Sequence, residues 1–130
     1  GVTHGGLANY VACVPARLGF DADAGGRFGL VQGQGTDLGN TMVFSSLVSG
    51  GVLDVLDADA VTDPQAVAEF IAGGVDFLKV VPSHLAALGA GDGLAGLVPS
   101  RSLVLGGEAA PVGWVRELVS AAGGRAVHNH

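Results

Sequence analysis

The stretch VDFLKVVPSH, residues 75–84, is an apolar run that follows two glycines and ends at a proline and a serine. Such a run is typical of a buried strand that leads directly into a helix. Lys79, the only lysine of the chain, lies inside it. A buried ammonium is costly, so either its head reaches water over an apolar surface or a negative group meets it. We infer the second alternative, and we expect that negative group to be a ligand.

Helical and strand patterns alternate along the whole chain. Helices are expected at residues 4–18, 37–49, 63–72, 82–88 and 111–122, strands at 27–32, 52–57, 76–81, 101–107 and 125–129, and a flexible loop at 88–100. The strands are continuous apolar runs, which favours a parallel sheet covered on both faces. We therefore predict a three-layer α/β fold, with about five mostly parallel strands flanked by helices in a flavodoxin-like arrangement, as a single domain at 1–130. Ligands of such sheets bind beyond the carboxyl ends of the strands.

Composition narrows the classes of function. The formal net charge is −6 and no basic stripe is present, which argues against binding to nucleic acid. Apolar residues make up 48% of the chain, yet no apolar run has the length of a membrane span, so we expect a cytoplasmic protein. The single cysteine, Cys13, excludes an internal disulfide and, among apolar neighbours, is expected to be buried.

Polar residues and glycines follow several of the predicted strands. Asp37 follows a Gly-rich stretch whose spacing does not fit a dinucleotide fingerprint, and it either caps a helix or is a carboxylate that waits for a cation. Thr41 shares the helical face of Asp37. Val104 and Gly106 share one face of a strand, and Glu108 either begins a helix or belongs to a site. No metal site is expected, because the histidines lack partners at metal-ligand spacing.

Five segments, taken in order, resemble one known family. They are GVTHGGLANYV (1–11), TDLGNTMVFSSLVSGG (36–51), FLKVVPSHLAAL (77–88), SLVLGGEAAPVGWV (102–115) and VHNH (127–130). They resemble, respectively, the segment after the phosphate loop, the aromatic-Asp-x-Ser helix, the strand-Pro-Ser-helix segment, the Gly-Gly-Glu-Ala segment and the residues before Tyr-Gly-Pro-Thr-Glu in amino-acid adenylation domains of nonribosomal peptide synthetases. Thr36 stands where that family usually has phenylalanine.

The resemblance implies a set of substrate-binding residues. Asp37 matches the carboxylate that holds the α-ammonium of the substrate, and the side-chain pocket is matched by Leu38, Thr41, Lys79, Val104, Gly106 and His130. This order of residues resembles the pattern of aspartate-activating domains. Asn129 matches a residue that contacts adenine, and Gly107, Glu108 and Ala109 match the segment beside the adenine ring. No catalytic residue falls in the matched segments.

The resemblance also implies a function for a larger parent protein. The parent is expected to activate L-aspartate with ATP and Mg, and to load it on the phosphopantetheine thiol of a peptidyl carrier domain, as in antibiotic biosynthesis. We expect the 130 residues to be the middle, pocket-lining subdomain of that adenylation domain, inactive alone because the phosphate loop and the C-terminal catalytic lysine are absent. A hydroxylated aspartate remains open as the substrate. The alternatives are a free-standing flavodoxin-like binding module, a subdomain of an acyl- or aryl-acid ligase, and a folding unit without a ligand.

Overall fold

The computed structural model describes residues 1–20, 25–33 and 35–130, so Gln34 of the Gly-rich stretch lies outside the described residues. Eleven elements follow one another within the described part of the chain: α1 (His4–Arg17), β1 (Arg27–Leu30), α2 (Asp37–Ser49), β2 (Val52–Val55), α3 (Pro64–Ala72), β3 (Phe77–Val80), α4 (Pro82–Leu88), the short 3-10 helix η1 (Ala95–Leu97), β4 (Ser102–Leu105), α5 (Val112–Ala122) and β5 (Ala126–Asn129). Among these helices, none is both long and apolar enough to cross a membrane.

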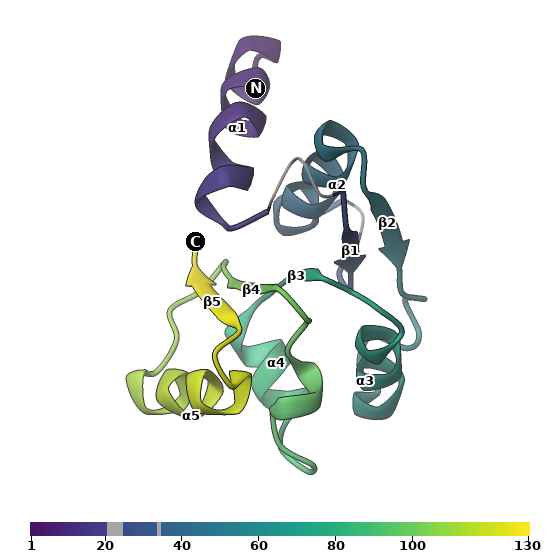
Figure 1. The fold of residues 1–130 in the computed structure, drawn as a ribbon, viewed down its shortest axis with the longest axis vertical. Coiled ribbons are helices and arrows are strands. Elements are labelled where there is room, and N and C mark those ends of the chain that lie inside the picture. The colour runs from purple at the N-terminus through teal and green to yellow at the C-terminus, as the bar shows by residue number, and fades with distance from the viewer. Residues whose placement is uncertain (21–24, 34) are drawn as a thin grey trace.

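The strands form one parallel sheet in the order β2-β1-β3-β4-β5. Figure 1 shows α1 and α2 on one side of this sheet and α3, α4 and α5 on the other. The predicted three-layer α/β fold with five parallel strands is therefore confirmed. All strands begin and end within the predicted ranges, but each is shorter than predicted, at four residues.

One local prediction is wrong. The stretch 88–100 was expected to be a flexible loop, but it contains η1, and Leu97 and Val98 are buried in the larger core. The guanidinium of Arg125 donates to the Val98 carbonyl at 2.7 Å, which ties this stretch to the start of β5. Packing of two apolar side chains and one charge-assisted hydrogen bond offset the entropy cost of ordering a Gly-rich segment.

The helix that follows β1 begins at a side-chain cap. Thr36 is the N-cap of α2, and its hydroxyl accepts the backbone N–H of Gly39 at 3.4 Å. Asp37 is the first residue inside the helix, and its side chain is exposed. Of the two roles considered for Asp37, helix capping thus belongs to its neighbour, and the carboxylate of Asp37 stays available at the helix N-terminus, where a negative charge is favourable.

Alternation along the strands divides the interior into two cores, one on each face of the sheet. On β3, Leu78 and Val80 belong to the larger core beneath α3, α4 and α5. Phe77 belongs to the smaller core, which also holds Phe28, Met42 and Val104. Lys79 is two residues from Phe77, so its side chain leaves the sheet on the side of α1 and α2. The single ammonium therefore lies on the less apolar face.

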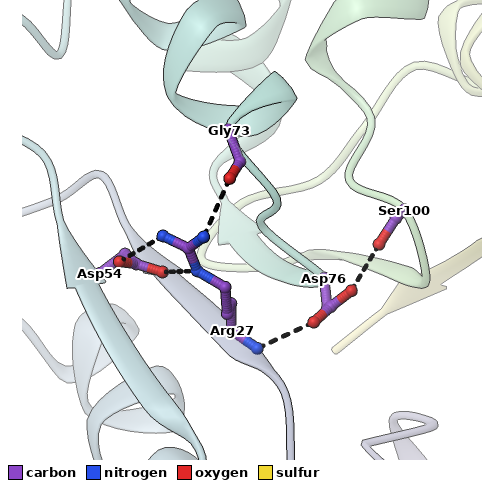
Figure 2. A network of polar contacts seen from close by, with 5 residues as sticks. All are labelled: Arg27, Asp54, Gly73, Asp76 and Ser100. Atoms are coloured by element: carbon purple, nitrogen blue, oxygen red, sulfur yellow. Dashed lines mark hydrogen bonds and ion pairs between the residues drawn. The ribbon is translucent and has the colours of Figure 1, made fainter.

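The amino ends of the strands are joined by a polar network, shown in Figure 2. The Arg27 guanidinium donates to both carboxylate oxygens of Asp54, at 2.8 and 3.0 Å, and to the Gly73 carbonyl at 2.9 Å. The Asp76 carboxylate accepts the backbone N–H of Arg27 at 2.9 Å and the Ser100 hydroxyl at 2.7 Å. This network joins the start of β1 and the residue before β3 to Asp54 within β2.

Candidate functional site

The Lys79 ammonium is buried on the α2 side of the sheet. The residue is 5% exposed, and Nζ donates to Oγ1 of Thr41 at 2.8 Å and lies 2.9 Å from Nδ1 of His130. Burial lowers the pKa of Lys79 below its ordinary value. Within the residues that the structure describes, the one ion pair joins Arg27 and Asp54, so no carboxylate there pairs with Lys79. Its hydrogen-bond partners among the described residues are a hydroxyl and an imidazole nitrogen.

The contact with Lys79 defines the protonation of His130. An ammonium has three N–H donors and no acceptor, so Nδ1 of His130 must accept and the ring proton lies on Nε2. Burial, and then the positive charge of Lys79, lower the pKa of His130, which favours this neutral form. His130 is exposed at its outer side. Its Nε2–H is therefore a donor that remains for another molecule.

Tyr10 is a member of this cluster that the analysis of motifs missed. Its hydroxyl lies 2.7 Å from Oγ1 of Thr41, and its ring centroid lies 6.4 Å from that of His130. Leu7, Tyr10 and Val14 recur at helical spacing along α1, and this apolar stripe was the signal available for Tyr10. The spacing did not indicate that α1 contacts α2 at Thr41. That contact depends on how the two helices pack in the tertiary structure.

A cavity of about 610 Å³ opens above these residues, a size typical of small-molecule sites. It is lined by Val2, Gly6, Leu7 and Tyr10 from the first segment and α1, by Asp37, Leu38, Asn40, Thr41 and Phe44 from α2, and by Lys79, Gly107 and His130 from the ends of three neighbouring strands. The lining is mostly apolar, with one carboxylate and one ammonium. The arrangement can bind a small molecule that carries a positive and a negative group.

The cavity brings together most, but not all, of the residues predicted for the site. Asp37, Leu38, Thr41, Lys79, Gly107 and His130 line it. Val104 is fully buried in the smaller core, where it pairs in register with Lys79 and is not part of the cavity wall. Gly106 lies against the Lys79 stem, since a Cβ built there would be 2.9 Å from Cε of Lys79.

The remaining predicted residues lie at or just beyond the carboxyl ends of β4 and β5. Glu108, Ala109 and Asn129 are exposed and are not among the residues that line the cavity. The carboxylate of Glu108 accepts the backbone N–H of Ser83 in the first turn of α4, and this contact lowers the pKa of Glu108. Glu108, which follows β4, therefore caps α4, the helix that follows the neighbouring strand β3. It does not begin the helix that follows it in sequence.

One further expectation is wrong. Cys13 was expected to be buried, but it is exposed. Helix α1 packs on α2 with one side, and Cys13 lies outside that contacting side. Across residues 1–20, 25–33 and 35–130, no group of three His, Cys, Asp or Glu side chains is arranged to hold a metal ion.

Comparison with known proteins gives a likeness to solved structures. No family model matches the chain, and no curated protein matches it. The crystal structure of CmiS6 is similar, with a TM-score of 0.79 and 25% identity, over 92% of this chain and 29% of that one. A second similar structure is that of holo-PA1221, described as an NRPS protein containing adenylation and PCP domains bound to a vinylsulfonamide inhibitor. Its TM-score is 0.72 and its identity 23%, over 84% of this chain and 19% of that one.

This chain thus spans less than a third of each of these two proteins. The likeness to holo-PA1221 concerns the fold, and it supports an adenylation-domain-like fold for the 130 residues.

Proposed function

We propose that these 130 residues form the amino-acid-recognising part of a nonribosomal peptide synthetase adenylation domain. The parent would activate L-aspartate with ATP to aspartyl-AMP and transfer it to the thiol of a carrier domain. The motifs shared with that family and the likeness in fold to an adenylation-domain protein support this proposal. The observation that carries it is the Lys79 ammonium, which is buried at the cavity without a carboxylate partner among the described residues.

The charges at the cavity match those of aspartate. Asp37, exposed at the N-terminus of α2, would hold the α-ammonium, and Lys79, deeper in the structure, would attract the side-chain carboxylate. The α-carboxylate is then left for the reaction with ATP. Asparagine has nearly the same shape, but it would leave Lys79 without a counter-charge, and an unpaired buried charge costs about 3–5 kcal/mol. Leu38 would limit the length of the side chain and so disfavour glutamate.

The segments beside the cavity would hold the nucleotide of the parent, with its Mg ion. Gly107 lines the cavity, and its backbone φ of 86° is a conformation that favours glycine. Because glycine has no side chain, the nucleotide could approach the backbone closely there. Ala109 and Asn129 are exposed nearby on the segments that follow β4 and form β5. The carboxylate of Glu108 is occupied by Ser83, so Glu108 would contribute through its backbone. Nucleic acid and membrane are not proposed as partners.

The test is an ATP–pyrophosphate exchange profile of the complete adenylation domain that contains these residues. We expect exchange to be highest with L-aspartate or its hydroxylated relative, and lower with L-asparagine by roughly a hundredfold, which corresponds to the cost of an unpaired buried charge. The isolated 130 residues are expected to show no exchange. Highest exchange with an uncharged amino acid would refute aspartate as the substrate. Exchange with aryl or acyl acids only would favour an aryl- or acyl-acid ligase as the parent. No exchange by the complete protein would favour a binding module.

A further inference from the structure

Two hydrogen-bonded paths leave the Lys79 ammonium, and both end at the same cavity. One path runs directly to Nδ1 of His130, at 2.9 Å. The other runs to Oγ1 of Thr41 at 2.8 Å and from there to the hydroxyl of Tyr10 at 2.7 Å. All four residues line the cavity, but Lys79 and Thr41 are buried, at 5% and 1% exposed, whereas Tyr10 is half-buried and His130 is exposed. Lys79 is therefore the inner end of both paths, and Tyr10 and His130 are the outer ends.

The donor–acceptor rules fix the direction of the two contacts that the Lys79 ammonium makes. The ammonium can only donate, so Oγ1 of Thr41 and Nδ1 of His130 both accept from it. Thr41 keeps one proton of its own, and in this pair, where either hydroxyl can be the donor, it can donate that proton to the Tyr10 oxygen while it accepts from the ammonium. The Tyr10 proton is then left for the cavity, as is the Nε2 proton of His130. The single buried charge thus strengthens two neutral donors at the surface of the cavity.

The two outer donors flank one small region. The rings of Tyr10 and His130 are 6.4 Å apart between centroids and are inclined at 59°. A carboxylate has two acceptor oxygens and no donor, so it can accept from both groups at once. A carboxamide has one acceptor oxygen, and its NH2 group would meet a second donor. Donors of this kind discriminate strongly, because a mismatched ligand leaves a buried polar group unpaired.

We propose that Tyr10 is a specificity-determining residue, whose hydroxyl and the Nε2–H of His130 donate to the two oxygens of the side-chain carboxylate of the ligand. This inference rests on the proposed function, because it assigns a further contact to the same amino-acid site. Tyr10 lies in the first of the five matched segments, but the resemblance implied no site role for it. It belongs to α1, a different element from the helix and strands that carry the predicted residues. A purely structural role for Tyr10 would be to hold α1 against α2.

The first experiment measures kcat/KM for L-aspartate and L-asparagine in the complete adenylation domain. We expect Tyr10→Phe to lower the aspartate-to-asparagine ratio about tenfold, as for the loss of one hydrogen bond to a charged group. Thr41→Val interrupts the path, so Tyr10→Phe should have little further effect on the ratio in that background. Ser49→Ala is the matched control, because it removes a hydroxyl from the far end of α2, where it bonds to the Ser46 carbonyl.

The second experiment follows the Lys79 amine by NMR in the 130-residue chain, where a single lysine gives an unambiguous signal. Tyr10→Phe should lower the Lys79 pKa, because Thr41 loses the acceptor of its proton, and Ser49→Ala should leave it unchanged. Equal loss of activity with both amino acids, or an unchanged Lys79 pKa, would show that Tyr10 only tethers α1 and would overturn the inference. If the unaltered enzyme shows no preference for aspartate, while Tyr10→Phe still lowers the Lys79 pKa, the proposed function would be overturned.

Discussion

Nζ of Lys79 lies 2.9 Å from Nδ1 of His130, a residue 51 positions further along the chain. The contact joins the middle strand of the sheet to the residue that follows its edge strand β5. It places the only ammonium of a lysine beside a ring nitrogen that can accept its proton, and it keeps both at the cavity. The substitutions below separate what this arrangement does for binding from what it does for the fold.

Lys79→Met should abolish activation of aspartate by the complete adenylation domain, by more than roughly a hundredfold, and preserve the fold. Methionine fills the space of the stem, and replacing buried ionic groups by apolar side chains of similar volume is often neutral or stabilises a fold by about 1–4 kcal/mol. Pyrophosphate exchange and thermal unfolding measure the two effects. Aspartate activation within about tenfold of the unaltered enzyme would show that Lys79 does not meet the substrate carboxylate.

Asp37→Ala should reduce exchange with every amino acid that the enzyme accepts, because Asp37 is proposed to hold the common α-ammonium. The side chain is exposed and Thr36 caps the helix, so unfolding should change by less than about 0.5 kcal/mol. The measurement is the exchange profile over aspartate and its weaker competitors. A loss confined to aspartate would contradict the assigned role, since such selectivity belongs to the side-chain pocket.

Gly106→Ala should displace Lys79 from its present position. The added Cβ would lie 2.9 Å from Cε of Lys79, closer than real Cβ contacts, and 3.0 Å from the His130 carbonyl oxygen, tighter than most of them, so the Lys79 stem would have to move. We expect a loss of about 1–3 kcal/mol in stability and a lower preference for aspartate over asparagine. Gly113→Ala on α5 is the matched control, because a Cβ there meets nothing within 4 Å and should leave activity unchanged. An unaffected preference in Gly106→Ala would mean that the Lys79 stem tolerates the methyl group.

The titration of His130 should report on Lys79. Burial and the neighbouring charge lower the His130 pKa below 6.5, so the unfolded chain binds more protons than the folded chain between the folded pKa and about 6.5. Stability is then fully present above pH 6.5 and falls as the pH decreases through that window. NMR of His130 should show its pKa rising toward the ordinary value in Lys79→Met. No rise would assign the shift to burial alone.

Asp76→Ala should destabilise the fold without altering specificity. Its carboxylate accepts from the Arg27 amide and the Ser100 hydroxyl, as Figure 2 shows. None of these three residues lines the cavity. Loss of these acceptors should cost about 1–3 kcal/mol in denaturant unfolding. Asp92→Ala, the same change at an exposed turn, should cost less than about 0.5 kcal/mol. A change in the aspartate-to-asparagine ratio of Asp76→Ala would show that the two ends of the sheet are coupled.

The sequence predicted those parts of the fold that depend on local pattern. Apolar runs between Gly-Gly and Pro indicated the strands, and Asp63-Pro64 indicated the start of α3, which the Asp63 carboxylate caps. The pattern also showed that Lys79 requires a partner, because a charge inside a buried run is costly in any fold. Local pattern was a poorer guide at Cys13 and at residues 88–100, where exposure and order depend on which neighbouring segment packs there.

By itself, the sequence determined the order and type of the elements, the parallel sheet and the presence of one ammonium within it, since these follow from periodicity and from the cost of burial. Only the tertiary structure decided which side chains surround that ammonium. Tyr10, Thr41 and His130 come from a helix, a second helix and the end of the edge strand, and no spacing in the sequence links them. Their meeting depends on how α1 and α2 pack over the carboxyl ends of β3 and β5, and packing of distant segments is fixed by the whole fold.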